Sequence, residues 1–309
     1  MADFADVVSD VVTDAKARFH WRKLRKLTKA CDVGDRGTVV KIASAHPYLV
    51  QERCKQYHMS PLGAAVRRGY LEIVRWLVEE SGVRLFRHGR FSPLPTAVRR
   101  GHMDVAEYLL EQGFSARENA LMAAVEKNNL PMVRVLLAHG RIDPTAGIDY
   151  GDPCSGSLYR SPFSTAVRSG HVDIVALMLE TMTGSRQGDV NKAESGITPL
   201  VSACSVHPKR WESTTPGEED PWLRIVRLLL SQPAIDVNKG VPLADAARHS
   251  PALTMALLAH PDMDATRTRY GKTPLEWADH PACRHLIEEH LAAKASDPST
   301  TLRRSKSIG

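Results

Sequence analysis

A six-residue pattern recurs along this chain at a spacing close to 35 residues. It consists of a small or polar residue, usually followed by proline, then an apolar residue, two variable positions and alanine. Six well-matched copies begin at Ser60, Ser92, Ser161, Thr198, Val241 and Thr273, and two copies without proline begin at Arg25 and Asn119. Such periodicity is typical of repeat proteins, in which each unit packs against its neighbours.

Each copy is followed by a tight turn and then by an amphipathic apolar run. Examples of the turn are Gly69-Tyr70, Gly101-His102 and Gly170-His171. A Ser or Thr that caps a helix, a proline in its first turn and a glycine at its end fit a short helix over the motif. We therefore expect each unit to be a short helix, a turn, a longer helix and an extended connection.

The recurring motif resembles the T-P-L-H-x-A signature of ankyrin repeats. The resemblance covers roughly residues 24–292 in about eight repeats, although the fourth motif position is never His. It implies an all-α ankyrin-repeat solenoid of stacked helix-turn-helix units with short, hairpin-like finger loops. It also implies binding of a partner protein through a concave groove and the fingers, as an adaptor, scaffold or inhibitor without catalytic activity.

This pattern predicts that the chain is divided into three segments. Residues 1–22 are expected to form an amphipathic capping helix with a basic flank, residues 23–292 the ankyrin array, and residues 293–309 a disordered basic tail. The array has two insertions, near 147–160 and near 205–220, the second between the two helices of one repeat. Tolerated drift and partner contact both remain open as explanations for them. In the tail, Arg303 to Ser307 could be a phosphorylation site or a nuclear-localisation patch.

An apolar stripe at helical spacing lies near the N-terminus. It comprises Phe4, Val7, Val8, Val11, Val12, Ala15 and Phe19, and it does not continue onto Leu24 and Leu27. We therefore expect a helix over about residues 3–19 and a break near His20. The preferred interpretation is a cap over the apolar end of the first repeat. A dimerisation helix and a membrane-surface helix are the alternatives.

The formal net charge of +6 is concentrated in the flanks. Residues 16–29 contain seven basic residues and no acidic one, the tail contributes three more, and residues 1–14 contain four aspartates. The long middle of the chain is neutral. Phe19 and Trp21 interleave with the basic residues of 16–29, so binding of nucleic acid or an anionic surface there is the alternative function. We do not expect nucleic acid to be the main partner.

A stripe of arginines gives the first candidate binding site. Aligning the repeats places cations at the end of the first helices, at Arg67, Arg68, Arg99, Arg100, Arg168 and Arg248. In the ankyrin family this region lines the groove, so the arginines would suit an acidic protein surface. The alternative is structural, because cations also stabilise helix C-termini.

Aromatic and imidazole side chains on the fingers and insertions give the second candidate site. Tyrosine suits an interface because it combines a large apolar ring with a polar tip. The candidates are Tyr57, His88, Tyr150, Tyr159, Trp211 and Tyr270.

No catalytic signature is present in the sequence. It lacks G-x-G-x-x-G, GxxxxGK[ST], H-E-x-x-H and G-x-S-x-G, and the repeats leave no room for a catalytic domain. Five scattered cysteines include no CxxC pair, which argues against a disulfide framework or a zinc site. We expect no enzyme activity and no cofactor. We also expect no membrane span, a monomer when unbound, and a location in the cytosol or nucleus.

Overall fold

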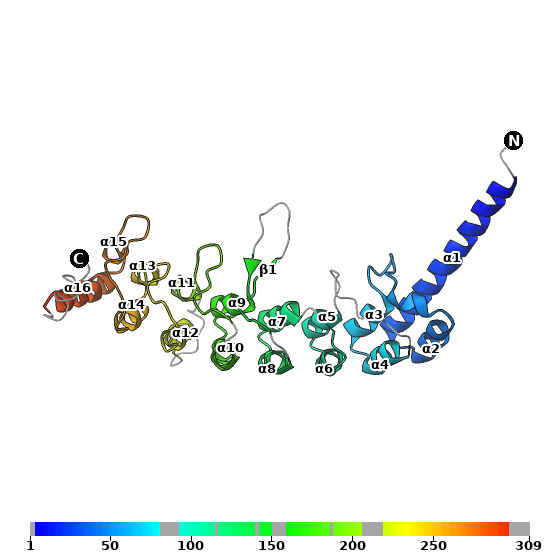
Figure 1. The fold of residues 1–309 in the computed structure, drawn as a ribbon, viewed down its shortest axis with the longest axis horizontal. Coiled ribbons are helices and arrows are strands. Elements are labelled where there is room, and N and C mark those ends of the chain that lie inside the picture. Colours follow the sequence, from blue (N-terminus) through cyan, green and yellow to red (C-terminus); the bar gives the residue numbers. More distant parts are fainter. Residues whose placement is uncertain are drawn as a thin grey trace, which may run out of the picture. The chain divides into compact units, whose positions relative to one another are not determined.

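The computed structural model describes residues 4–80, 93–114, 117–139, 142–149, 159–185, 188–205 and 219–296. Within them the fold is helical, and regular strand pairing is limited to one hairpin of two-residue strands. The chain divides into two compact units, residues 1–140 and 141–309, each described separately below (Figure 1).

The first unit contains eight α-helices and one short 3-10 helix among its described residues. In chain order they are α1 (Phe4–Val33), α2 (Arg36–Ala45), η1 (Pro47–Gln51), α3 (Pro61–Arg68), α4 (Leu71–Glu79), α5 (Pro93–Arg100), α6 (Met103–Glu111), α7 (Arg117–Glu126) and α8 (Leu130–His139).

The second unit begins with a hairpin and continues with helices. Its described elements are β1 (Ile148–Asp149), β2 (Tyr159–Arg160), α9 (Pro162–Ser169), α10 (Val172–Ser185), α11 (Pro199–Cys204), α12 (Pro221–Leu230), α13 (Pro242–Ala247), α14 (Pro251–Leu258), α15 (Pro274–Trp277) and α16 (Pro281–Ser296).

Each copy of the sequence motif lies in the first helix of a helix pair, as predicted. Ser60, for example, caps α3 by accepting a hydrogen bond from the Gly63 N–H at 3.1 Å. Gly69 ends α3 with φ of 79°. At the weaker copy, Asn128 replaces glycine and takes the same left-handed conformation, with φ of 52°. The local signals therefore fix where the first helices begin and end.

Packing of each pair against its neighbours makes the core. First helices pack on first helices and second helices on second helices, which gives each unit two rows of helices (Figure 1). The motif alanines Ala65, Ala97, Ala124, Ala166, Ala203 and Ala246 are all fully buried. Alanine is needed there because a larger side chain would push neighbouring helices apart.

Asparagine side chains link successive connections in the second unit. Asn191 donates to the Ala234 carbonyl at 2.7 Å and accepts from the Asp236 N–H at 2.8 Å. Asn238 repeats this arrangement one unit later, with the Asp262 carbonyl at 2.7 Å and the Asp264 N–H at 2.9 Å. Backbone groups that no helix satisfies are thereby paired across the repeat boundary.

The predicted break near His20 is wrong. Helix α1 runs without interruption from Phe4 to Val33 and ends at Gly34, whose φ is 83°. The physical reason is that no proline or glycine occurs within α1, and a change of apolar face does not interrupt a helical backbone. The predicted capping helix is thus continuous with the first helix of the first repeat. Whether residues 4–18 cover that repeat stays a prediction, because their side chains lie outside the described residues.

Candidate functional site

The arginine stripe lies at the ends of first helices, as predicted, but its members have different surroundings. Arg67 and Arg68, at the end of α3, both bind the carboxylate of Asp32. The Arg67 Nη2 atom lies 2.7 Å from Asp32 Oδ1, and the Arg68 Nε and Nη2 atoms lie 2.9 and 3.0 Å from Oδ1 and Oδ2. Hydrogen bonding from Arg68, helped by Arg67, lowers the pKa of Asp32 to about 2. These two arginines are therefore paired within the chain, although the three charges together sum to +1.

Arg248, in the second unit, is also engaged. Its Nε atom lies 3.6 Å from Asp279 Oδ2, and its guanidinium lies 5.7 Å from the centre of the Trp277 ring. Arg168, at the end of α9, is half-buried. No acidic side chain forms an ion pair with Arg168 within the described part of the chain.

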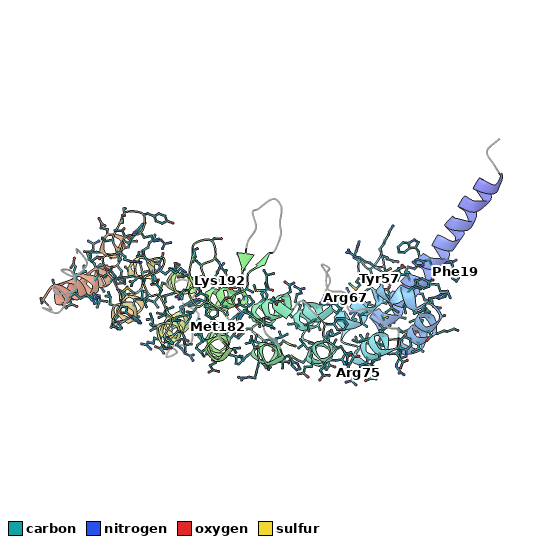
Figure 2. All side chains as sticks on the ribbon, in the orientation of Figure 1. Phe19, Tyr57, Arg67, Arg75, Met182 and Lys192 are labelled. Atoms are coloured by element: carbon teal, nitrogen blue, oxygen red, sulfur yellow. The ribbon has the colours of Figure 1, made fainter. Side chains whose placement is uncertain are left out.

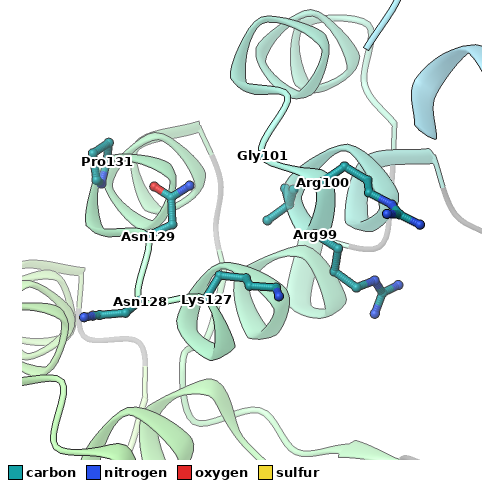
Figure 3. Close-up of a pocket in the computed structure, with 8 residues that line it drawn as sticks. Arg99, Arg100, Gly101, Lys127, Asn128, Asn129 and Pro131 are labelled. Atoms are coloured by element: carbon teal, nitrogen blue, oxygen red, sulfur yellow. The ribbon is translucent and has the colours of Figure 1, made fainter. Parts of the chain in front are cut away.

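Arg99 and Arg100, at the end of α5, are exposed. Among the described residues neither forms an ion pair. They border a shallow cleft of about 450 Å³ whose lining also includes Lys127 and the two asparagines that follow it (Figure 3). Figure 3 shows Arg99, Arg100 and Lys127 extending on the same side of the helices. We call these three residues the cationic cleft.

The backbone explains why the cleft exists. Gly101 and Asn128 end α5 and α7 in the left-handed conformation, with φ of 79° and 52°. Helices α5 and α7 therefore each end with their last side chains at the surface, and the chain turns there into the second helix of each pair. Glu126 precedes Lys127, so the three residues of the cationic cleft and Glu126 together carry a net charge of +2. Two guanidinium groups and an ammonium group at the edge of one cleft can bind carboxylates or phosphates.

The predicted finger residues differ in how exposed their side chains are. Tyr57 lies on a loop closed by the bridge between Cys54 and Met59, on the first-helix side of unit 1, whereas Arg75 lies on second helix α4 (Figure 2). Tyr57 is half-buried. Tyr270 is 86% exposed at a hairpin tip between Arg269 and Lys272.

Tyr270 and Gly271 both have positive φ, 51° and 78°, as a two-residue type I′ hairpin turn requires. Tyrosine rarely adopts this conformation, so the backbone at the tip is strained. The Arg269 guanidinium lies 5.5 Å from the centre of that ring.

The insertions are only partly described. The insertion near 147–160 begins and ends in the β1–β2 hairpin, which pairs Ile148 with Arg160 and Asp149 with Tyr159. The insertion near 205–220 lies between α11 and α12, as predicted. His88, Tyr150 and Trp211 lie outside the described residues, as does the side chain of Tyr159.

Trp277 is a surface feature that sequence reasoning missed. Its Nε1 donates to the Arg269 carbonyl at 3.2 Å, and the ring lies 5.4 Å from Lys272 Nζ. With Arg248 also near its ring, Trp277 joins a predicted stripe residue to the finger that carries Tyr270. A large aromatic residue at a variable motif position was the available signal.

In the described parts of the chain, potential metal ligands are scattered rather than clustered. No group of three or more His, Cys, Asp or Glu side chains there could hold a metal ion. Cys31, Cys54, Cys204 and Cys283 are buried free thiols, and burial raises the pKa of the Cys31 thiol to about 12. Of the helices described, none is both long and apolar enough to cross a membrane.

Comparison with known proteins agrees with this geometry. Residues 62–147 match a model described as ankyrin repeats in three copies. Among solved structures, the human ASB11 ankyrin repeat domain superposes with a TM-score of 0.52 at 23% sequence identity, covering 75% of this chain and 97% of that one. No curated protein sequence matches the chain.

Proposed function

Taking as premise that this chain is an ankyrin-repeat protein, we propose that it binds an acidic segment of a partner protein at the cationic cleft. Ankyrin repeats are generally protein-interaction modules, and the fold is typically non-catalytic. In this proposal the chain acts as an adaptor, scaffold or inhibitor in the cytosol or nucleus. The cleft supplies the contact that selects a negatively charged partner.

The observation that supports this most is the difference between two neighbouring arginine pairs. Arg67 and Arg68 share the carboxylate of Asp32, whereas Arg99 and Arg100 are exposed and form no ion pair among the described residues. Helix-end stabilisation alone accounts equally for both pairs. It does not account for two unpaired guanidinium groups beside a third cation. Bidentate binding of a carboxylate by arginine is a stronger and more specific interaction than a helix-end effect.

The finger of the second unit is a separate candidate contact surface in this proposal. Tyr270 presents an exposed ring, and Trp277, which donates a hydrogen bond to the Arg269 carbonyl, has Arg248 and Lys272 near its ring. Such aromatic side chains contribute much of the binding energy at protein interfaces. We assign Tyr57 a smaller role, because its side chain is already half-buried in its own repeat.

The test is an affinity pull-down that compares the wild type with two variants of matched charge change. The cleft variant is Arg99→Glu/Arg100→Glu/Lys127→Glu, and the control reverses three exposed cations elsewhere, Arg134→Glu/Lys192→Glu/Lys239→Glu. Circular dichroism confirms that each protein folds. A specific partner should be retained by the wild type and the control and lost with the cleft variant. Equal retention by all three would show that the cleft is not the binding surface.

A further inference from the structure

Three of the large exposed apolar side chains gather at one place in the first unit. Phe19 and Tyr48 are each 55% exposed, and Trp21 is 39% exposed. Two histidines connect them: the ring centres are 6.2 Å apart for Phe19 and His46, 5.9 Å for His46 and Tyr48, and 5.7 Å for Tyr48 and His20. We call Phe19, His20, Trp21, His46 and Tyr48 the aromatic patch. A contiguous exposed patch of this kind marks an interaction surface.

The surroundings of the patch are basic. Lys23 Nζ lies 5.2 Å from the centre of the Phe19 ring, and Lys55 Nζ lies 5.1 Å from that of Trp21. Glu52 is the acidic residue in contact with the patch, and it is already bound to His20 Nε2 at 2.5 Å. The surface therefore fits an occupant that is both apolar and acidic.

The chain itself contains a segment with that composition. Residues 1–14 include four aspartates, no basic residue, and the apolar Phe4, Val7, Val8, Val11 and Val12. The seven basic residues of 16–29, by contrast, have no acidic residue among them. Acidic and basic halves are thus placed in tandem on one helix.

Helix geometry prevents this segment from reaching the patch of its own chain. Helix α1 is continuous from Phe4 to Val33. At 1.5 Å per residue, position 8 lies about 20 Å along the axis from position 21. The acidic segment of one chain can therefore reach only the patch of another chain.

The sequence spacing suits such a pairing. Six of the seven positions of the apolar stripe, 4, 8, 11, 12, 15 and 19, are symmetric about the midpoint between 11 and 12, whereas Val7 faces Lys16. In an antiparallel pair centred there, position 4 faces 19, position 8 faces 15 and position 11 faces 12. A two-fold interface requires this self-complementarity. The same arrangement brings each acidic half beside the basic half of the other helix.

We propose that two copies of this chain form an antiparallel dimer through α1, with the N-terminal end of α1 in each copy, around Phe4, lying against the aromatic patch of the other. An antiparallel dimer replaces the expectation, from the sequence, of a monomer when unbound. It is independent of the cationic cleft, since it concerns a different surface and needs no other protein.

The test uses charge reversal and measures mass by light scattering after size exclusion. One full-length variant carries Asp3→Lys/Asp6→Lys, and the other carries Arg18→Glu/Arg22→Glu. At about 100 µM and low salt, a concentration that populates dimers of micromolar affinity, the wild type should have twice the monomer mass of 34.1 kDa. Each variant alone should be monomeric, and their equimolar mixture should restore the dimer mass, because only the mixture pairs opposite charges.

The control is Lys192→Glu/Lys239→Glu, which reverses two exposed lysines in the second unit and should remain dimeric. A wild type that is monomeric under these conditions overturns the proposal, as does a dimer that both variants leave intact. A labelled single-stranded oligonucleotide is tested in parallel. Tight binding by a monomeric wild type, lost in Trp21→Ala, overturns the dimer and assigns the patch to nucleic acid.

Discussion

Gly69 is required at the end of α3 for two separate reasons. Its φ of 79° is unfavourable for other residues, and a Cβ atom there would lie 2.5 Å from Nδ1 of His102. The His102 ring also binds the Arg67 carbonyl through Nε2 at 3.1 Å, so it cannot move without losing that contact. The glycine thus sets both the turn and the approach of the next repeat.

We expect Gly69→Ala to destabilise the protein by about 2–3 kcal/mol, from left-handed strain and the displaced imidazole. Gly101→Ala is the matched control, since Gly101 has the same φ of 79° and nothing lies within 4 Å of its added Cβ. It should cost only about 1 kcal/mol. Urea denaturation followed by circular dichroism measures both values. Equal losses would mean that the contact with His102 contributes nothing.

The carboxylate of Asp32 makes the free energy of unfolding depend on pH. Because its folded-state pKa is lowered to about 2 by Arg68 and Arg67, its stabilising contribution is complete above its usual pKa of 3.8 and is lost as the pH falls toward 2. We expect Asp32→Asn to cost about 1 kcal/mol at pH 7, allowing for solvent screening. The difference from wild type should shrink between pH 4 and pH 2 in urea titrations. A difference that is constant across that range would show that the carboxylate charge is not responsible.

This ion pair also shows where sequence reading stops. The sequence placed Arg67 at a helix end correctly, because the motif and Gly69 fix that end locally. It could not show that Asp32, 35 residues earlier, lies beside Arg67, since that contact depends on how neighbouring repeats stack. The unpaired cations of the cationic cleft could be identified only after this pairing was known.

At the scale of elements, α1 shows that the periodicity of apolar residues does not by itself predict where a helix ends. The shift of the apolar stripe before Leu24 reflects a real change, since Leu24 and Leu27 are buried whereas Phe19 is exposed. The shift predicts a break in the helix, yet it is a change of surroundings along one continuous helix. Glycine and proline are the better guides to helix ends, and here Gly34 marks the end.

The asparagine links between connections make a prediction at this scale. Asn191→Ala removes one donor and one acceptor to the following connection. Since each net hydrogen bond contributes about 0.5–1.5 kcal/mol, we expect a loss of about 1–2 kcal/mol, the bonds being exposed. The urea transition should also broaden, because a weaker boundary lets repeats unfold separately. Asn191→Asp keeps only the acceptor, so its stability should lie between that of the wild type and that of Asn191→Ala. A loss of stability as large as that of Asn191→Ala would show that the acceptor contributes nothing.

At the scale of the whole molecule, contacts between helices are strictly local. Helix α3 packs on α1 and α5, and α12 packs on α10 and α14. Each helix pair therefore depends on its neighbours, and few contacts link distant parts of the sequence. Stability in such an array is the sum of repeat and boundary terms, which the 35-residue period alone was enough to predict.

It follows that damage at one repeat should spread only a short way. In Gly69→Ala, hydrogen exchange should accelerate most in α3 and α4, less in the flanking pairs α1–α2 and α5–α6, and hardly at all in α15 and α16. Exchange measured by mass spectrometry on peptides of the wild type and the variant resolves these regions. Uniform acceleration along the chain would show that the array unfolds as one cooperative block. A graded response would mean that each repeat can adjust its stability separately, so that a partner bound at the cationic cleft stabilises chiefly the repeats around α5 and α7.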